Sequence, residues 1–287
     1  MTGGGTKPGG RRAGCAVLVA AALVAVVPSA TASVQLGSVA RGDLGVTCDG
    51  APADLFATGA APRVGAARPI DYTVSGAGTI TSWESYAGGA GGRIAFKVFR
   101  PGGGLYTVAA AEPPRDLVPL ALNGFLTSIP VQPGDVIGFN DNGVPSGCVM
   151  AGPTPLTLLE RVGNLGAGQA GAFASLGPGS IPNLRAYMTP SNEFTVDLER
   201  KGRKGAVTMR LALPGPGELK LKSGRLKAPR EITVAVAGEV ERVLRPKAKT
   251  RRQLRRRSRV NAKLKVTYQP TGGAPSERQE KLRLRRR

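Results

Sequence analysis

The chain has 287 residues, 40 basic and 19 acidic side chains, a formal net charge of +21 and no histidine. The lack of histidine excludes a Ser-His-Asp triad, a Cys-His nucleophile and histidine-ligated zinc. The excess of positive charge favours an anionic partner.

Residues 1–32 have the pattern of an export signal. Lys7, Arg11 and Arg12 precede an apolar run, Ala13 to Val27, that is too short to span a bilayer comfortably. Small residues follow up to Ala32, as a signal peptidase requires. We expect a signal peptide over 1–32 and a mature chain that is secreted or extracellular, with association with the cell wall as one option. The alternative is an uncleaved membrane anchor. No second apolar run long enough to span a membrane follows.

Two cysteines remain after residue 32, Cys48 and Cys148. Outside the cytoplasm, a single pair is most simply one disulfide. It would close a loop of about a hundred residues and stabilise the fold by about 4–5 kcal/mol through loop entropy. Two separate buried thiols are the alternative.

Short β-branched runs separated by glycine and proline predict an all-β protein. A jelly-roll-like β-sandwich is expected over 33–198. Within Arg93–Val98, the residues Ile94, Phe96 and Val98 share one face, and Arg93 and Lys97 share the other. The segment 156–187 fits either a long loop or poorly patterned strands. The predicted strands are 70–74, 78–83, 93–99, 105–110, 124–131, 134–139 and 194–198.

The charge changes abruptly near residue 193. Residues 33–192 carry 9 basic and 10 acidic side chains, whereas residues 193–287 carry 28 basic and 9 acidic ones. We expect a linker at 199–205 and a small basic immunoglobulin-like β-sandwich at 206–287. Its runs alternate apolar and polar residues, as in Val207, Met209, Leu211 and Leu213.

The basic domain has a surface suited to a polyanion. Lys220, Lys222, Lys263 and Lys265 alternate with apolar residues and should lie on outer faces. The run 251–259 has six arginines around Leu254, which as a strand-connecting turn would plug the sandwich end. The alternative is that this charge only provides solubility and protects sheet edges. The predicted polyanion-binding residues are Arg251, Arg252, Arg255, Arg256, Arg257, Arg259, Lys263 and Lys265.

Anionic cell-wall polymers, anionic lipid head groups and extracellular DNA would all suit that surface. Sequence-specific binding of nucleic acid is not expected, because no recognition helix is predicted and Tyr268 is the only aromatic residue after Phe194.

Other candidate sites lie in the first domain. Trp83 and Tyr86 could stack on a glycan, although the only tryptophan could equally fill the core. Ile80 and Trp83 have opposite parity on one strand, which leaves both options open. Asp135, after Gly134, should cap a turn. No metal or cofactor is expected. The acids inside or beside strands, which a glycan hydrolase or lyase would need, are Asp71, Glu84, Asp135 and Asp141.

The segments Gly78–Trp83, Ile94–Pro101 and Ile129–Gly138 resemble uncharacterised secreted β-sandwich proteins of high-GC Gram-positive bacteria. The final third is similar to the basic immunoglobulin-like modules that follow such domains. This resemblance implies an envelope or extracellular module and assigns no site residue. We therefore expect a non-enzymatic, envelope-associated structural or interaction protein that its basic sandwich retains on anionic polymers. The alternatives are a carbohydrate-binding protein that uses an exposed aromatic residue and, less favoured, a glycan hydrolase or lyase.

Overall fold

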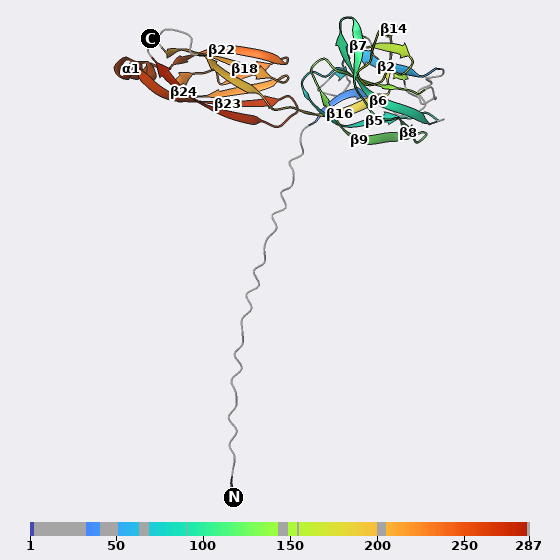
Figure 1. The fold of residues 1–287 in the computed structure, drawn as a ribbon, viewed down its shortest axis with the longest axis horizontal. Helices are drawn as coiled ribbons and strands as arrows, with labels where there is room; N and C mark the ends of the chain where they lie inside the picture. The colour runs from blue at the N-terminus through green and yellow to red at the C-terminus, as the bar shows by residue number, and fades with distance from the viewer. Residues whose placement is uncertain are drawn as a thin grey trace. The chain divides into compact units, whose positions relative to one another are not determined.

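A computed structural model describes residues 1–2, 33–40, 51–62, 69–89, 91–142, 149–153, 155–199 and 205–285. These residues form strands and one helix (Figure 1), which confirms the predicted all-β class. Cys48, Cys148, most of the signal segment and residues 200–204 of the expected linker lie outside the described residues. No helix in the described part of the chain is long and apolar enough to cross a membrane.

The first sandwich has two main antiparallel sheets. The smaller sheet has the order β1-β16-β5-β9, from β1 (Val34–Ser38), β16 (Leu184–Pro190), β5 (Gly78–Tyr86) and β9 (Leu122–Val131). The larger sheet has the order β13-β7-β6-β10-β2-β12-β14, with β8 paired to β6. Its strands are β13 (Ala170–Gly171), β7 (Leu105–Ala111), β6 (Gly92–Gly102), β10 (Val136–Asn140), β2 (Ala53–Thr58), β12 (Thr157–Val162), β14 (Ala174–Pro178) and β8 (Arg115–Leu117). Two short pairs, β3 (Ala60–Ala61) with β4 (Ile70–Asp71) and β11 (Val149–Ala151) with β15 (Ser180–Pro182), complete it.

The segment 156–187, which the sequence pattern left unassigned, forms β12 to β16 and part of the core. Phe173 packs against Phe56 and Phe99, with ring centroids 4.7 and 5.4 Å apart. Gly138, on β10 beside Phe56, has no room for a side chain, because a Cβ there would lie 2.7 Å from Phe56 Cβ. The larger sheet is therefore covered on both faces, which explains why every residue from Ile94 to Phe99 is buried.

A change of register on β5 explains why Ile80 and Trp83, which are three residues apart, both point into the core. The pairing of β5 with β16 shifts between Ile80 and Ser82, so that Thr81 is an extra residue. Such a bulge reverses which face the following side chains occupy. Thr81 is exposed, and both Ile80 and Trp83 are fully buried in one core.

The second sandwich packs two four-stranded antiparallel sheets around a separate core. One has the order β17-β18-β22-β20, from β17 (Thr195–Glu199), β18 (Val207–Leu213), β22 (Gly238–Pro246) and β20 (Leu226–Lys227). The other has the order β21-β19-β23-β24, from β21 (Glu231–Val234), β19 (Gly217–Lys222), β23 (Arg259–Pro270) and β24 (Ser276–Arg285).

The expected domain boundary at residue 198 is wrong by one strand. The predicted first sandwich, 33–198, includes the strand 194–198. In the structure this strand, β17, pairs with β18, and Val196 lies opposite Leu211. Phe194 belongs to the second core, where its ring centroid lies 5.8 Å from that of Tyr268. Glu199, the expected first linker residue, is the last residue of β17. The apolar run predicted a strand correctly, but only its partner shows which core the strand covers.

The arginine-rich run forms a helix, α1 (Ala248–Arg257), rather than the expected turn. Thr250 and Leu254, one helical turn apart, are its buried residues, and Leu254 belongs to the second core as expected of a plug. Three arginines in the last turn favour the helix through its dipole. Ser258 ends it in a left-handed conformation and donates its N–H to Leu254 O at 3.1 Å.

Candidate functional site: a basic groove on the second sandwich

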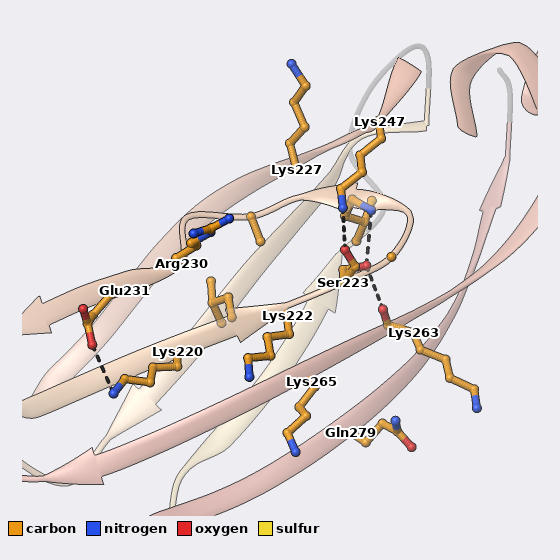
Figure 2. Close-up of a pocket in the computed structure, with 14 residues that line it drawn as sticks. Lys220, Lys222, Ser223, Lys227, Arg230, Glu231, Lys247, Lys263, Lys265 and Gln279 are labelled. Atoms are coloured by element: carbon orange, nitrogen blue, oxygen red, sulfur yellow. Dashed lines mark hydrogen bonds and ion pairs between the residues drawn. The ribbon is translucent and has the colours of Figure 1, made fainter. Parts of the chain in front are cut away.

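The outer face of the sheet β21-β19-β23-β24 has two neighbouring hollows. The larger, of about 780 Å³, is called the lysine groove here and is drawn in Figure 2. Its basic lining residues are Lys220, Lys222, Lys227, Arg230, Lys247, Lys263 and Lys265, against one acid, Glu231. The second, called the adjoining hollow, measures about 720 Å³ and is lined by Arg225, Lys263, Lys281 and Arg283 with no acid. Both hollows include Gly224 and Lys263.

Strand alternation creates this surface. Leu219 and Leu221 are buried while Lys220 and Lys222 are exposed, as predicted from their spacing. On β23, Ala262, Leu264 and Val266 are buried, which turns Lys263 and Lys265 outward. Lysines on both strands therefore meet on the outer face.

The register then places like charges directly opposite one another. Lys222 on β19 faces Lys265 on β23, and Lys265 faces Gln279 on β24. One row further along, Lys263 faces Lys281, and at the strand ends Arg259 faces Arg285. Figure 2 shows Lys222 and Lys265 side by side on neighbouring strands. Like charges in such positions destabilise a sheet.

Carboxylates neutralise only one end of this face. Lys220 Nζ lies 3.2 Å from Glu231 Oε1, and this hydrogen bond is the main cause of the raised pKa of Lys220. Lys265 forms an ion pair with Glu277. Toward α1, by contrast, no carboxylate of the described residues lies within ion-pair distance of Lys222, Lys263 or Lys281.

The turn between the two hollows is tied to its surroundings. Ser223 Oγ donates to Lys263 O at 2.7 Å, and Lys247 Nζ donates to Ser223 O at 2.9 Å (Figure 2). Arg225 Nη1 donates to Gln253 Oε1 on α1, also at 2.9 Å. These bonds hold the rim of the lysine groove against the sheet and α1.

The predicted polyanion residues fall into two groups. Lys263 and Lys265 line the lysine groove. The arginines do not enter either hollow: Arg259 begins β23, and the other five are exposed on α1. These five are Arg251, Arg252, Arg255, Arg256 and Arg257.

Sequence reasoning missed Lys227, Arg230 and Lys247, which come from turns and strand ends and have no pattern of their own. It also missed Lys281 and Arg283, although their alternation with Leu282 and Leu284 could have identified them as outward residues.

Of the two alternatives for Trp83, the structure excludes stacking on a glycan, because Trp83 is fully buried in the core. Its indole Nε1 donates to Glu112 Oε2 at 2.9 Å, and its ring packs between Phe96 and Phe125, with centroids 5.4 and 4.4 Å away. Tyr86 is half-buried at the end of β5, and Trp83, the other residue considered for glycan stacking, is buried.

The four acids considered for catalysis are each engaged locally. Asp135 accepts two hydrogen bonds from Arg100 and one from Gln132 N, which confirms a turn-capping role. Glu84 pairs with Arg185, and Asp141 accepts from Ala53 N at 2.8 Å. Asp71 accepts from Thr73 N, and burial raises its pKa. Within the described residues, no group of three or more His, Cys, Asp or Glu side chains could hold a metal ion.

No protein-family model and no curated protein matches this chain. Among solved structures, a β-D-glucuronidase of Dictyoglomus thermophilum is similar over 83% of this chain and 44% of that chain, with 10% identity and a TM-score of 0.16. The chain thus spans less than half the length of that enzyme. At such a TM-score the likeness supports neither a fold nor an activity.

Proposed function

We propose that this is an exported, non-catalytic interaction protein whose second sandwich attaches it to an anionic polymer of the cell envelope. The observation that carries this proposal is the row structure of the outer sheet face, where Lys263 faces Lys281 and neither has a carboxylate partner among the described residues. In the neighbouring row Lys222 faces Lys265, whose ammonium group is paired with Glu277. A polyanion would supply the missing counter-charges.

The magnitude of the charge supports binding over solubility alone. A small domain needs a net charge of about 2–8 to stay soluble, and residues 193–287 hold 28 basic against 9 acidic side chains. Each like-charge pair across strands costs roughly 0.2–1 kcal/mol. An anionic polymer would remove that cost, and its binding would release condensed counterions.

The remainder of the proposal rests on the first sandwich and the N-terminal pattern. The signal-like segment 1–32 and the Cys48 and Cys148 pair support export. The local engagement of Asp71, Glu84 and Asp135 supports a structural or interaction role for the first sandwich. We do not propose glycan binding through Trp83, because its ring is buried.

Co-sedimentation of the mature protein with purified cell walls across a salt series tests the proposal. We expect the protein to pellet at about 50 mM salt and to be released by about 200 mM. The variant Lys222→Gln/Lys263→Gln should be released at lower salt. A control with the same loss of charge, Arg242→Gln/Arg115→Gln, changes two exposed residues that line neither hollow, one on β22 and one on β8 of the first sandwich.

The proposal is wrong if the mature protein stays in the supernatant at low salt. It is also wrong if the groove variant and the Arg242→Gln/Arg115→Gln control are released at the same salt concentration, because retention would then follow net charge and not this face.

A further inference from the structure

We infer that the lysine groove and the adjoining hollow together bind one continuous linear phosphate polymer, with Lys263 contacting it in both. This inference rests on the proposed function, that the second sandwich binds a polyanion, and adds the chemical class of the ligand and its path. The path crosses the turn Ser223–Arg225, which lies between the two hollows.

The two hollows meet at this turn, where they share lining residues. Gly224 and Lys263 line both of them. A Cβ placed on Gly224 would have no atom within 4 Å, so no side chain forms a wall there. Lys263 is exposed, and its ammonium group has no carboxylate partner among the described residues. In the inferred path the polymer crosses the turn beside Gly224, where no atom occupies the space of a side chain.

The cations recur at regular intervals along this path. Lys222 and Lys265 form one row, and Lys263 and Lys281 form the next, two residues further along the strands. Neighbouring strands lie about 4.8 Å apart, and two residues along a strand span roughly 6.8 Å. A repeating array on a rigid sheet fits a polymer with repeating anions better than it fits one small ion.

The chemistry of the lining points to phosphate. No aromatic residue is among those that line either hollow. Proteins hold sugar rings and unpaired bases largely by stacking them on aromatic side chains. Lysine ammonium groups act as point charges that bind phosphate without a required orientation. The surface thus recognises the charged group of the polymer rather than its sugar or base.

Titration of the mature protein with inorganic tripolyphosphate and with long-chain polyphosphate at one salt concentration tests the inference. Tripolyphosphate can occupy one hollow, whereas the long chain can occupy both. We expect the long chain to bind at least about a hundredfold more tightly per phosphate, because its second contact is intramolecular. Lys263→Gln should remove most of this advantage.

Single-hollow variants refine the test. Lys222→Gln and Lys281→Gln each alter one hollow. Each should weaken long-chain binding and lower the slope of log affinity against log salt by about 1. Arg242→Gln, on β22 of the other sheet, removes one charge that lines neither hollow and should change neither quantity.

The outcomes distinguish a failure of this inference from a failure of the proposed function. If the long chain binds no better per phosphate than tripolyphosphate, or if heparin binds as tightly as polyphosphate, the inference is overturned while polyanion binding stands. If Lys222→Gln, Lys281→Gln and Arg242→Gln behave alike, the path across the turn is wrong. If no polyanion binds, the proposed function fails as well.

Discussion

Lys97 Nζ lies 2.5 Å from Asp54 Oδ1, and neither side chain is more than 2% exposed. The same ammonium group donates to Asn164 Oδ1 and to Leu165 O, both at 2.7 Å. Asp54 Oδ2 accepts from Leu165 N at 2.9 Å. The pair therefore holds the segment after β12 over the larger sheet, on the face opposite Ile94 and Phe96. Burial lowers the pKa of Lys97, and the bond to Asp54 opposes this effect.

Replacing one partner of the Lys97–Asp54 ion pair should destabilise the first sandwich. Lys97→Met removes the ion-pair partner of the buried Asp54 carboxylate, so we expect the free energy of unfolding to fall by about 3–5 kcal/mol. Asp54→Asn should lower the free energy of unfolding by a similar amount. The double variant Lys97→Met/Asp54→Asn should lose less stability than the two single variants added together. Urea unfolding followed by fluorescence of Trp83, the only tryptophan, measures this in the first sandwich. A loss below about 1 kcal/mol in both single variants would contradict a structural role.

Trp83 should behave as a core residue. Because its ring lies between Phe96 and Phe125, acrylamide should quench its fluorescence weakly in the native protein and strongly in urea. Oligosaccharides should leave the emission unchanged. Trp83→Ala should destabilise the first sandwich by about 3–5 kcal/mol. At a temperature where the Trp83→Ala variant remains folded, its retention on cell walls should equal that of the unaltered protein.

Two substitutions in helix α1 should differ in their effect on stability, because one removes a buried side chain and the other an exposed charge. Leu254→Ala removes a buried side chain and should lower the stability of the second sandwich by about 2–5 kcal/mol. Arg251→Gln, one turn earlier and exposed, should change it by less than about 0.5 kcal/mol. Thermal unfolding followed by circular dichroism compares the two. Equal effects would show that Leu254 does not plug the sandwich.

Tyr268 predicts a loss of stability at alkaline pH. Burial raises its pKa to about 12 from an ordinary 10.0. The protonated hydroxyl donates a hydrogen bond to Gly215 O at 2.8 Å. Above the lower value, the unfolded chain loses a proton that the folded chain keeps, so stability falls as pH rises from about 10 to about 12. Tyr268→Phe should remove this part of the pH dependence. Chemical unfolding at several pH values, followed by circular dichroism, checks the difference between the two proteins.

The cysteine pair predicts a thiol count. If Cys48 and Cys148 form one disulfide, the mature protein unfolded without reductant should contain no free thiol. Reduction should then release two thiols and destabilise the first sandwich by about 4–5 kcal/mol through the larger entropy of the unfolded chain. Titration of thiols in denaturant measures the count, and two free thiols before reduction would contradict the disulfide.

Several features of the fold were predictable because they depend on local patterns. Strict alternation over Leu219–Lys222 identified a strand and its outward lysines, and β6 was found for the same reason. The helix α1 was missed because its apolar face consists of little more than Leu254, so no helical period is visible in the run. The pattern of the segment 156–187 did not distinguish a loop from strands, because the glycine and alanine in β13 and β14 show no clear alternation.

The sequence by itself determined the all-β class, the division of charge near residue 193 and the exclusion of histidine chemistry, since these depend on residue types and spacing along the chain. Only the tertiary structure decided that β17 belongs to the second sandwich, that Trp83 is buried and that Lys97 meets Asp54. It also decided which lysines face one another across β19, β23 and β24. Strand pairing and register join residues far apart in sequence, and a shift of one residue reverses the face of every side chain that follows.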